Sequence, residues 1–181
     1  IKDGKRWSTS RAFLRPVLDR PNLTVATHAA THRIVVENNK AVAVEYERDG
    51  QSHRANVSRE IVLSAGAVNS PQILMLSGIG PAEHLAEMGI EVVRDLPGVG
   101  RNLQDHVGTH VVNEVSATTL NNDARGLRGA MSVLRYALGR KGALSTSIGH
   151  AQAFVKSRPD LPAPNLQISF AAFAFDFDEQ G

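Results

Sequence analysis

Residues 61–80 read IVLSAGAVNSPQILMLSGIG, and this stretch decides the predicted fold. It opens with Ile61-Val62-Leu63, a short continuous apolar run of the kind found in strands that are covered on both faces. We predict a strand over 60–64 and a helix over about 71–77, separated by small residues. A buried strand, a tight turn and a helix in this order indicate a mixed α/β fold.

The turn Ala65-Gly66-Ala67 joins the predicted strand to the predicted helix using small side chains only. Such a turn lets the backbone approach a ligand phosphate or ring, because a branched Cβ would hold the ligand away. The other interpretation is a tight packing turn, and the pattern leaves both open. Ser70 suits the helix N-cap, Pro71 the first helical position and Gly78 the C-terminal cap.

Upstream of this stretch, the sequence predicts an antiparallel meander across about 23–57. Asn38-Asn39 and Asp49-Gly50 are dipeptides that favour tight turns between strands. Alternating apolar residues flank these turns, and the predicted strands are 23–27, 33–37, 41–47 and 52–57. A short helix over 7–20 precedes them.

Downstream, a second short helix starts at Pro81, presents Leu85 and Met88 to the interior and ends at Gly89, with a brief strand over 90–93. Further along, a stripe of apolar residues at helical spacing predicts another helix; its members are Leu127, Met131, Leu134 and Leu138. Strands are expected at 107–116, 151–155 and 165–175.

The composition is that of an ordinary globular chain, with 42% hydrophobic residues in a length of 181. The 20 Lys and Arg against 18 Asp and Glu give a net charge of +2, which makes no footprint for nucleic acid. No cysteine is present, so disulfides, cysteine metal sites and cysteine nucleophiles are excluded, and a cytoplasmic location is expected. No apolar stretch approaches the roughly 18 residues of a membrane span.

Three further patterns resemble motifs of cofactor-binding, metal or catalytic sites. Gly98-Val99-Gly100 lacks the third glycine of a dinucleotide fingerprint and follows a proline loop. The pairs His28/His32 and His106/His110 have i,i+4 spacing, but in extended chain four residues span about 13 Å, so no metal site is predicted. Asp105-His106 is an acid–base dyad or, as we favour, a hydrogen-bonded element that holds a loop.

The run Gly66 to Gly80 resembles the second signature of the glucose–methanol–choline oxidoreductases, in which a Gly, a Ser-Pro and two aliphatics precede Ser-Gly-Ile-Gly. Residues 95–106, DLPGVGRNLQDH, resemble another stretch of that family, and 20–25, RPNLTV, and the meander after it have the family's order. The resemblance covers roughly residues 10–110. Within the family, the sequence is most similar to a choline-dehydrogenase-like member. It implies an FAD-dependent enzyme that oxidises a small-molecule alcohol.

The resemblance also implies how the chain is organised. Family members bind the FAD pyrophosphate with an upstream glycine-rich turn and hold a catalytic His downstream, and this chain matches neither region. We therefore expect an internal fragment, inactive alone, with 1–106 as the later part of a Rossmann-like FAD-binding domain that includes the β-meander. Residues 107–181 would be the first part of a sheet-based substrate domain.

The family's cofactor contacts are carried over to matching positions. Thr31 would meet the adenine through its backbone, and Ala65 and Gly66 would lie beside the adenosine–diphosphate part. Ser70 starts the helix behind that turn, and Asn102 lies in the loop that leads to the substrate domain. No catalytic residue is nominated, because none of the seven His matches the catalytic one.

The implied reaction is hydride transfer from an alcohol carbon to the flavin N5. Two other hypotheses remain: an FAD-containing lyase of the same fold that cleaves cyanohydrins, and a non-catalytic interaction module. The lyase would differ from an alcohol oxidase in that its substrate leaves the flavin unreduced. The interaction module would need an exposed apolar patch that a partner covers.

Overall fold

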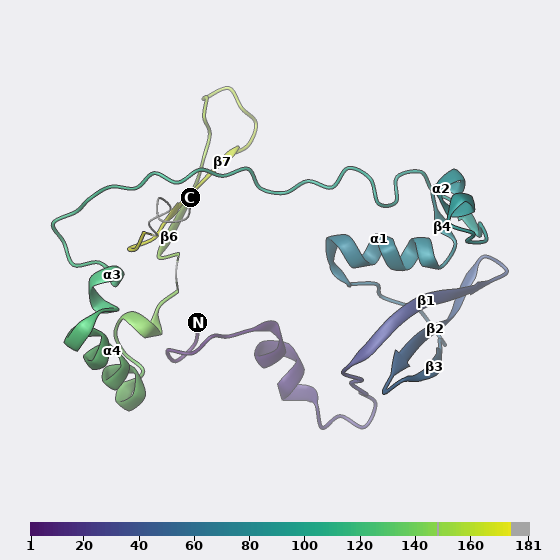
Figure 1. The fold of residues 1–181 in the computed structure, drawn as a ribbon, viewed down its shortest axis with the longest axis horizontal. Helices are drawn as coiled ribbons and strands as arrows, with labels where there is room; N and C mark the ends of the chain where they lie inside the picture. Colours follow the sequence, from purple (N-terminus) through teal and green to yellow (C-terminus); the bar gives the residue numbers. More distant parts are fainter. Residues whose placement is uncertain (148, 175–181) are drawn as a thin grey trace. The chain divides into compact units, whose positions relative to one another are not determined.

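The structure is a computed structural model that describes residues 1–147 and 149–174. These residues form two compact units, which we describe separately (Figure 1). The meander unit comprises Thr24–Gly108, and the basic unit comprises Ile1–Leu23 together with the chain from Thr109 onward. The second name refers to its charge, since 1–23 and 109–181 hold 13 Lys and Arg against 8 Asp and Glu.

The meander unit is built on a three-stranded antiparallel sheet of β1 (Ala29–Glu37), β2 (Lys40–Arg48) and β3 (Gln51–Asn56). Both connecting turns have the sequence-predicted chemistry: Asn38 and Asn39 have φ of 52° and 61°, and Asp49 and Gly50 have 54° and 71°. Positive φ at both central residues gives the turn twist that matches paired strands. The predicted meander is confirmed here, except that 23–27 forms no strand.

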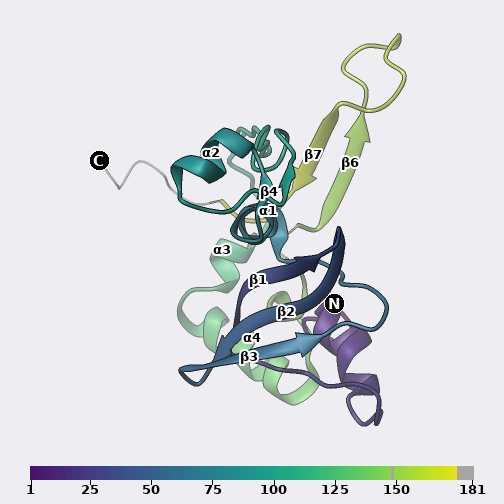
Figure 2. The ribbon, with the colours of Figure 1, turned by 90° about the vertical axis from the view of Figure 1, so that its right-hand side faces the viewer.

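Helix α1 (Gly66–Leu76) lies along β1, as Figures 1 and 2 show from two directions. It begins five residues before the predicted start, so Ser70 is not its N-cap and Pro71 is inside it. Proline has no N–H, so the Ala67 carbonyl loses its usual acceptor role at that turn. The helix ends one residue before the predicted end: Ser77, not Gly78, is the C-cap, and Gly78 follows with φ of 78°.

A small parallel pair, β4 (Ile79–Gly80) and β5 (Arg94–Asp95), encloses helix α2 (Ala82–Glu87). Pro81 is the N-cap of α2, and Leu85 is fully buried as expected. Two expectations were wrong. Met88 is exposed because it follows the last helical turn. No strand forms over 90–93, and the two residues that pair with β4 are the next two, Arg94 and Asp95.

The basic unit contains helices and one hairpin. Its elements are η1 (Ser10–Leu14), η2 (Arg15–Val17), α3 (Leu120–Asp123), α4 (Gly126–Gly139), η3 (Ala143–Ser145), β6 (Ala151–Val155) and β7 (Leu166–Phe170). The predicted helix over 7–20 is present as the two short, irregular helices η1 and η2. Strands β6 and β7 pair antiparallel, and the Asn165 side chain closes their loop by accepting from the Ser157 N–H at 2.8 Å. The predicted end of the last strand, Phe175, lies outside the described residues.

Two predicted strands do not form within the described part of the chain. Ile61–Leu63 has no ladder partner, and Val62 is 78% exposed. Residues 107–116 form no strand either, and Val107 is fully exposed. A strand is defined by its neighbours, since isolated extended chain leaves its backbone groups to water. The apolar pattern of both segments is real, but no described segment pairs with either.

The buried apolar side chains among the described residues are Ile34, Ala43, Ile73 and Leu85, and all belong to the meander unit. They come from β1, β2, α1 and α2, so the small core joins the sheet to its helices. The mixed helix-and-strand class with an antiparallel sheet, predicted from the sequence, is confirmed. Among the described residues, no helix is both long enough and apolar enough to cross a membrane.

Candidate functional site

The Ala65–Gly66 turn opens helix α1 with its backbone accessible. Gly66 has φ of 89°, a conformation that L side chains rarely adopt. Apart from its chain neighbours and the backbone of its own helix, no atom lies within 4 Å of the position that a Cβ at Gly66 would occupy. The open space therefore fits the approach of a ring or phosphate, and the glycine is required by backbone conformation, not by crowding.

Ser70 supports this turn from inside the helix. Its hydroxyl accepts a hydrogen bond from the Ala65 N–H at 3.1 Å. This satisfies one of the N–H groups that a helix start leaves without an intrahelical partner. The sequence correctly placed Ser70 near the start of the helix, but Ser70 is not the N-cap. It lies inside the helix, and its side chain points back to Ala65.

The other end of α1 is fixed to the sheet by Ser77. This side chain is only 6% exposed; its hydroxyl donates to the Ile73 carbonyl at 2.6 Å and accepts from the Ile34 N–H at 2.8 Å. Ile34 is in β1, so one hydroxyl connects the helix to the edge of the sheet. Sequence reasoning used Ser77 only as the end of a helix, and its partner is 43 residues away.

Thr31 lies on β1, three residues before Ile34 on the strand that α1 covers. It is exposed and pairs with Tyr46 of β2, and the ladder has a bulge between Thr31 and Arg33. The strand order β1-β2-β3 makes β1 an edge strand, so one side of its backbone is open to further hydrogen bonds. The structure therefore places Thr31 and the Ala65–Gly66 turn on two adjoining elements.

Asn102 is placed differently. It has φ of 57°, and its side-chain oxygen accepts from Gln104 at 3.2 Å. Just before it, a Cβ on Gly100 would meet the Met75 methyl group at 3.3 Å. Met75 is nine residues beyond Gly66, which is about 14 Å along a helix. The loop therefore contacts the end of α1 that is remote from the glycine turn.

The Asp105 carboxylate accepts from the backbone N–H of His106 at 2.7 Å, and both residues are exposed. This is a local loop contact and not an acid–base pairing of the two side chains. His32 has one acid near it, with Nε2 3.9 Å from the Glu47 carboxylate. Among the described residues, no three His, Cys, Asp or Glu gather as a metal site would need.

The sheet carries one perturbed acid. Arg33 donates to Glu45 at 2.7 Å, and this hydrogen bond holds the pKa of that carboxyl below its usual range, with added attraction from Arg33 and Arg54. Glu45 lies on β2 and Arg33 on the neighbouring β1, so the pair bridges adjacent strands. It is an exposed structural contact and no candidate for proton transfer.

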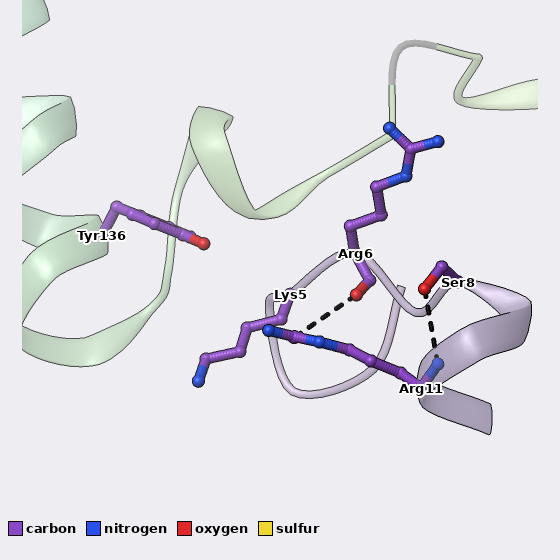
Figure 3. Close-up of a pocket in the computed structure, with 5 residues that line it drawn as sticks. All are labelled: Lys5, Arg6, Ser8, Arg11 and Tyr136. Carbon is purple, nitrogen blue, oxygen red and sulfur yellow. Dashed lines mark hydrogen bonds between the residues drawn. The ribbon is translucent and has the colours of Figure 1, made fainter. Parts of the chain in front are cut away.

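The described part of the chain is hollowed in both units. In the basic unit, a hollow of about 540 Å³ is lined by Lys5, Arg6, Ser8, Arg11 and Tyr136 (Figure 3). Its lining carries no carboxylate, and Arg11 donates to the Arg6 carbonyl at 3.5 Å. Sequence reasoning missed it because its lining comes from the N-terminal segment and from α4, whose positions no local pattern connects.

The second hollow, of about 400 Å³, lies in the meander unit between α2 and the loop after β5. His84 and Glu87 line it, with the His84 Nδ1 3.9 Å from the Glu87 carboxylate, and so do Met75 and Arg101. Its lining includes none of the residues predicted from the sequence to contact FAD.

Comparison with known proteins gives this geometry a family. The family model described as GMC oxidoreductase matches residues 1–108. Mouse mitochondrial choline dehydrogenase is 44% identical over 94% of this chain, and Pseudomonas putida alcohol dehydrogenase (acceptor) is 43% identical over 93%. The matches span 29% and 31% of those relatives, so the chain corresponds to about a third of their length.

Solved structures agree. An FAD-dependent oxidoreductase from Chaetomium thermophilum superposes with a TM-score of 0.63 at 33% identity, over 72% of this chain and 23% of that one. Formate oxidase from Aspergillus oryzae shares the fold with a TM-score of 0.79 at 22% identity, over 95% of this chain and 34% of that one. The chain therefore belongs to the GMC oxidoreductases, a family of FAD-dependent enzymes, as the signature at 66–80 had indicated.

Proposed function

We propose that the full-length protein oxidises the CH–OH group of a small, choline-like alcohol with FAD as cofactor, and that this chain provides part of the cofactor site. The observation that carries the proposal is the Gly66 turn: positive φ, open space on the Cβ side, and a helix fixed to β1 by Ser77. The choline and alcohol dehydrogenases among the relatives support the substrate class.

The roles of individual residues follow from their places in the meander unit. The Thr31 backbone, on an edge strand, would hold the adenine side of the cofactor. Ala65 and Gly66 would let the diphosphate side approach the backbone, and Ser70 would keep their turn in shape through its bond to the Ala65 N–H. Asn102 would contact the cofactor only from the far end of α1.

When bound, FAD supplies the acceptor for the hydride that leaves the alcohol carbon as the C–H bond breaks. The hydroxyl proton leaves to a base, and the carbon becomes a carbonyl. We assign neither step to a residue of this chain. Its contribution is to bind and orient, so we propose that residues 1–181 alone oxidise no alcohol.

We further propose a domain border near 106, with 107–181 opening the substrate domain. The end of the family-model match at 108 and the border of the meander unit at Gly108 support it. Residues 1–23 cluster with the later chain, which divides the first proposed domain. A cytoplasmic location is likewise proposed, on the absence of cysteine.

Gly66→Val in the full-length protein tests the site. We expect a lower flavin-to-protein ratio, because the added side chain would occupy the cofactor's space. Gly89→Val is the matched control, since Gly89 also has positive φ (68°) and nothing within 4 Å of its Cβ position. If both variants lose flavin equally, or Gly66→Val keeps a full complement, the assignment of the turn is wrong.

The reaction is tested by adding choline to the flavin-loaded full-length protein without oxygen. Bleaching of the flavin absorbance supports net oxidation of an alcohol. An unchanged spectrum with choline and with a panel of simple alcohols would contradict the proposed reaction.

The third test is equilibrium dialysis of residues 1–181 with FAD. We expect very weak binding, because the glycine-rich pyrophosphate turn of the family is not among these residues and the remaining contacts must offset an association cost of about 4 kcal/mol or more. Micromolar binding would contradict that expectation.

A further inference from the structure

The Ser77 hydroxyl is the hydrogen-bonded contact between α1 and the sheet. It accepts from the Ile34 N–H at 2.8 Å and donates to the Ile73 carbonyl at 2.6 Å, so it is donor and acceptor at once. All three residues are buried. Among residues 24–108, all of which the structure describes, no other hydrogen bond joins α1 or its C-cap to the three-stranded sheet.

This contact uses the open edge of β1. Backbone N–H groups of an edge strand alternate between the neighbouring strand and the open side, and that of Ile34 is directed to Ser77. Removing the hydroxyl leaves a buried donor without its acceptor. The helix then loses the group that fixes its position on the strand.

The two elements that meet at Ser77 each provide one of the proposed cofactor contacts. Thr31 is three residues before Ile34 on β1, about 10 Å along the strand. Gly66 begins α1, which ends at Ser77. Residues 38–65 lie between β1 and α1 in the chain, so the separation of the two contact points depends on how α1 is held against β1.

We infer that Ser77 is a positioning residue for the cofactor: its hydroxyl sets the separation between the Thr31 backbone and the Gly66 turn, so that one dinucleotide contacts both. Ser77 is buried and acts only through these two elements. The inference rests on the proposed function, because it concerns the same site. A ligand that spans two contact points loses affinity when their separation is no longer fixed, since binding must then order them.

The test measures binding of FAD and of ADP to flavin-free full-length protein by isothermal titration calorimetry, well below the melting temperature of every variant. ADP carries the adenine and the diphosphate without the flavin, so it spans both contact points. Ser77→Ala should weaken both ligands on the order of tenfold, within the roughly 5- to 150-fold range of coupled sites. Ser77→Cys keeps the size of the side chain with a weaker acceptor, so it should weaken both ligands less, and it replaces Ser77→Ala if that variant does not fold.

Ile73→Val is the matched control at the same contact. It removes one buried methylene and should lower the melting temperature, as Ser77→Ala does. It retains the Ser77 hydroxyl and both of its partners, because the group at residue 73 is the backbone carbonyl. Binding of FAD and ADP should therefore stay within about twofold of the parent.

The inference is overturned if Ser77→Ala binds both ligands as the parent does, or if Ile73→Val loses as much affinity. A loss confined to FAD would also overturn it, since the effect would then arise at the flavin. Gly66→Val separates these failures from that of the proposed function. If Gly66→Val loses ligand and Ser77→Ala does not, only the role of Ser77 is wrong. If Gly66→Val binds as the parent does, or the parent binds FAD and not ADP, the proposed site and the inference are both wrong.

Discussion

Different interactions stabilise the interior of the meander unit and that of the basic unit. The meander unit contains every buried apolar side chain among the described residues, and it ties sheet to helix through the buried Ser77 hydroxyl. The basic unit buries none of its described apolar side chains and relies on turns, a hairpin ladder and contacts between exposed side chains. Substitutions at equivalent positions should therefore cost far more in the first unit than in the second.

The largest difference should appear between two glycines of positive φ. A Cβ at Gly78 would collide with the Glu91 carbonyl and lie 2.8 Å from Val93 Cγ2, whereas a Cβ at Gly142 meets nothing within 4 Å. We expect Gly78→Ala to destabilise by about 4 kcal/mol or more, a cost reserved for such steric conflicts. Gly142→Ala should cost only the strain of its backbone conformation (φ 87°, ψ −164°), a region that is essentially restricted to glycine, about 1–3 kcal/mol. Thermal melts of the two variants that shift equally would break the comparison.

A second contrast uses two leucines on helices. Leu85 in α2 is 0% exposed, and Leu138 in α4 is 81% exposed. Leu85→Ala should cost about 2–5 kcal/mol, because it removes buried methyl groups and leaves a cavity. Leu138→Ala should stay within about 0.5 kcal/mol. Amide hydrogen exchange of α2 and α4 measures both locally, and a protected α4 that loosens in Leu138→Ala would show that its stripe is covered.

Ser77→Ala sharpens the account of the meander unit. The substitution leaves the Ile34 N–H buried without its acceptor, a cost of about 1–3 kcal/mol. Exchange of the Ile34 amide should accelerate by roughly 5- to 150-fold, since 1.4 kcal/mol is a factor of ten. Ser147→Ala is the control in the basic unit, where an exposed hydroxyl bonds to the Gly149 carbonyl at 2.8 Å and its loss should change little.

The smallest effect concerns Glu45. Its pKa is lowered chiefly by the hydrogen bond from Arg33, so the pair stabilises the fold above the ordinary carboxyl pKa of about 4.3. That stability is lost as the pH falls through the lower, folded-state pKa. Arg33→Gln should move the Glu45 pKa back up in an NMR titration.

Local chemistry made part of the fold predictable. Asn38-Asn39 and Asp49-Gly50 are favourable at positive φ, so they form turns whatever the surroundings. The spacing of the apolar stripe on α4 fits only the repeat of a helix. Ile61–Leu63 and 107–116 were predicted as strands from the same kind of pattern, and they form no strand here. Pairing depends on a neighbour that a local pattern does not contain.

The candidate site divides in the same way. Gly66 could be identified from the sequence because a turn made only of small residues lets a ligand approach the backbone. The structure places that turn at the start of a helix. The helix start itself was misplaced, because Ser70 and Pro71 have N-terminal preferences that the Gly66 turn overrides. The Ser77–Ile34 bond and the hollow behind Tyr136 join residues far apart in sequence, so no local signal could reveal them.

The position of the Ser77 bond makes α1 a lever. The helix is anchored where Ile73 and Ser77 are buried, while residues 66–69 are all exposed. The free end is about 16 Å from the anchor, so a tilt that is negligible at Ser77 displaces Gly66 by an ångström or more. A molecule bound against Gly66 would restrain this tilt at the end farthest from Ser77, where even a weak contact limits the motion most effectively. Cofactor loss should then raise hydrogen exchange at residues 66–70 while leaving residues 73–77 protected.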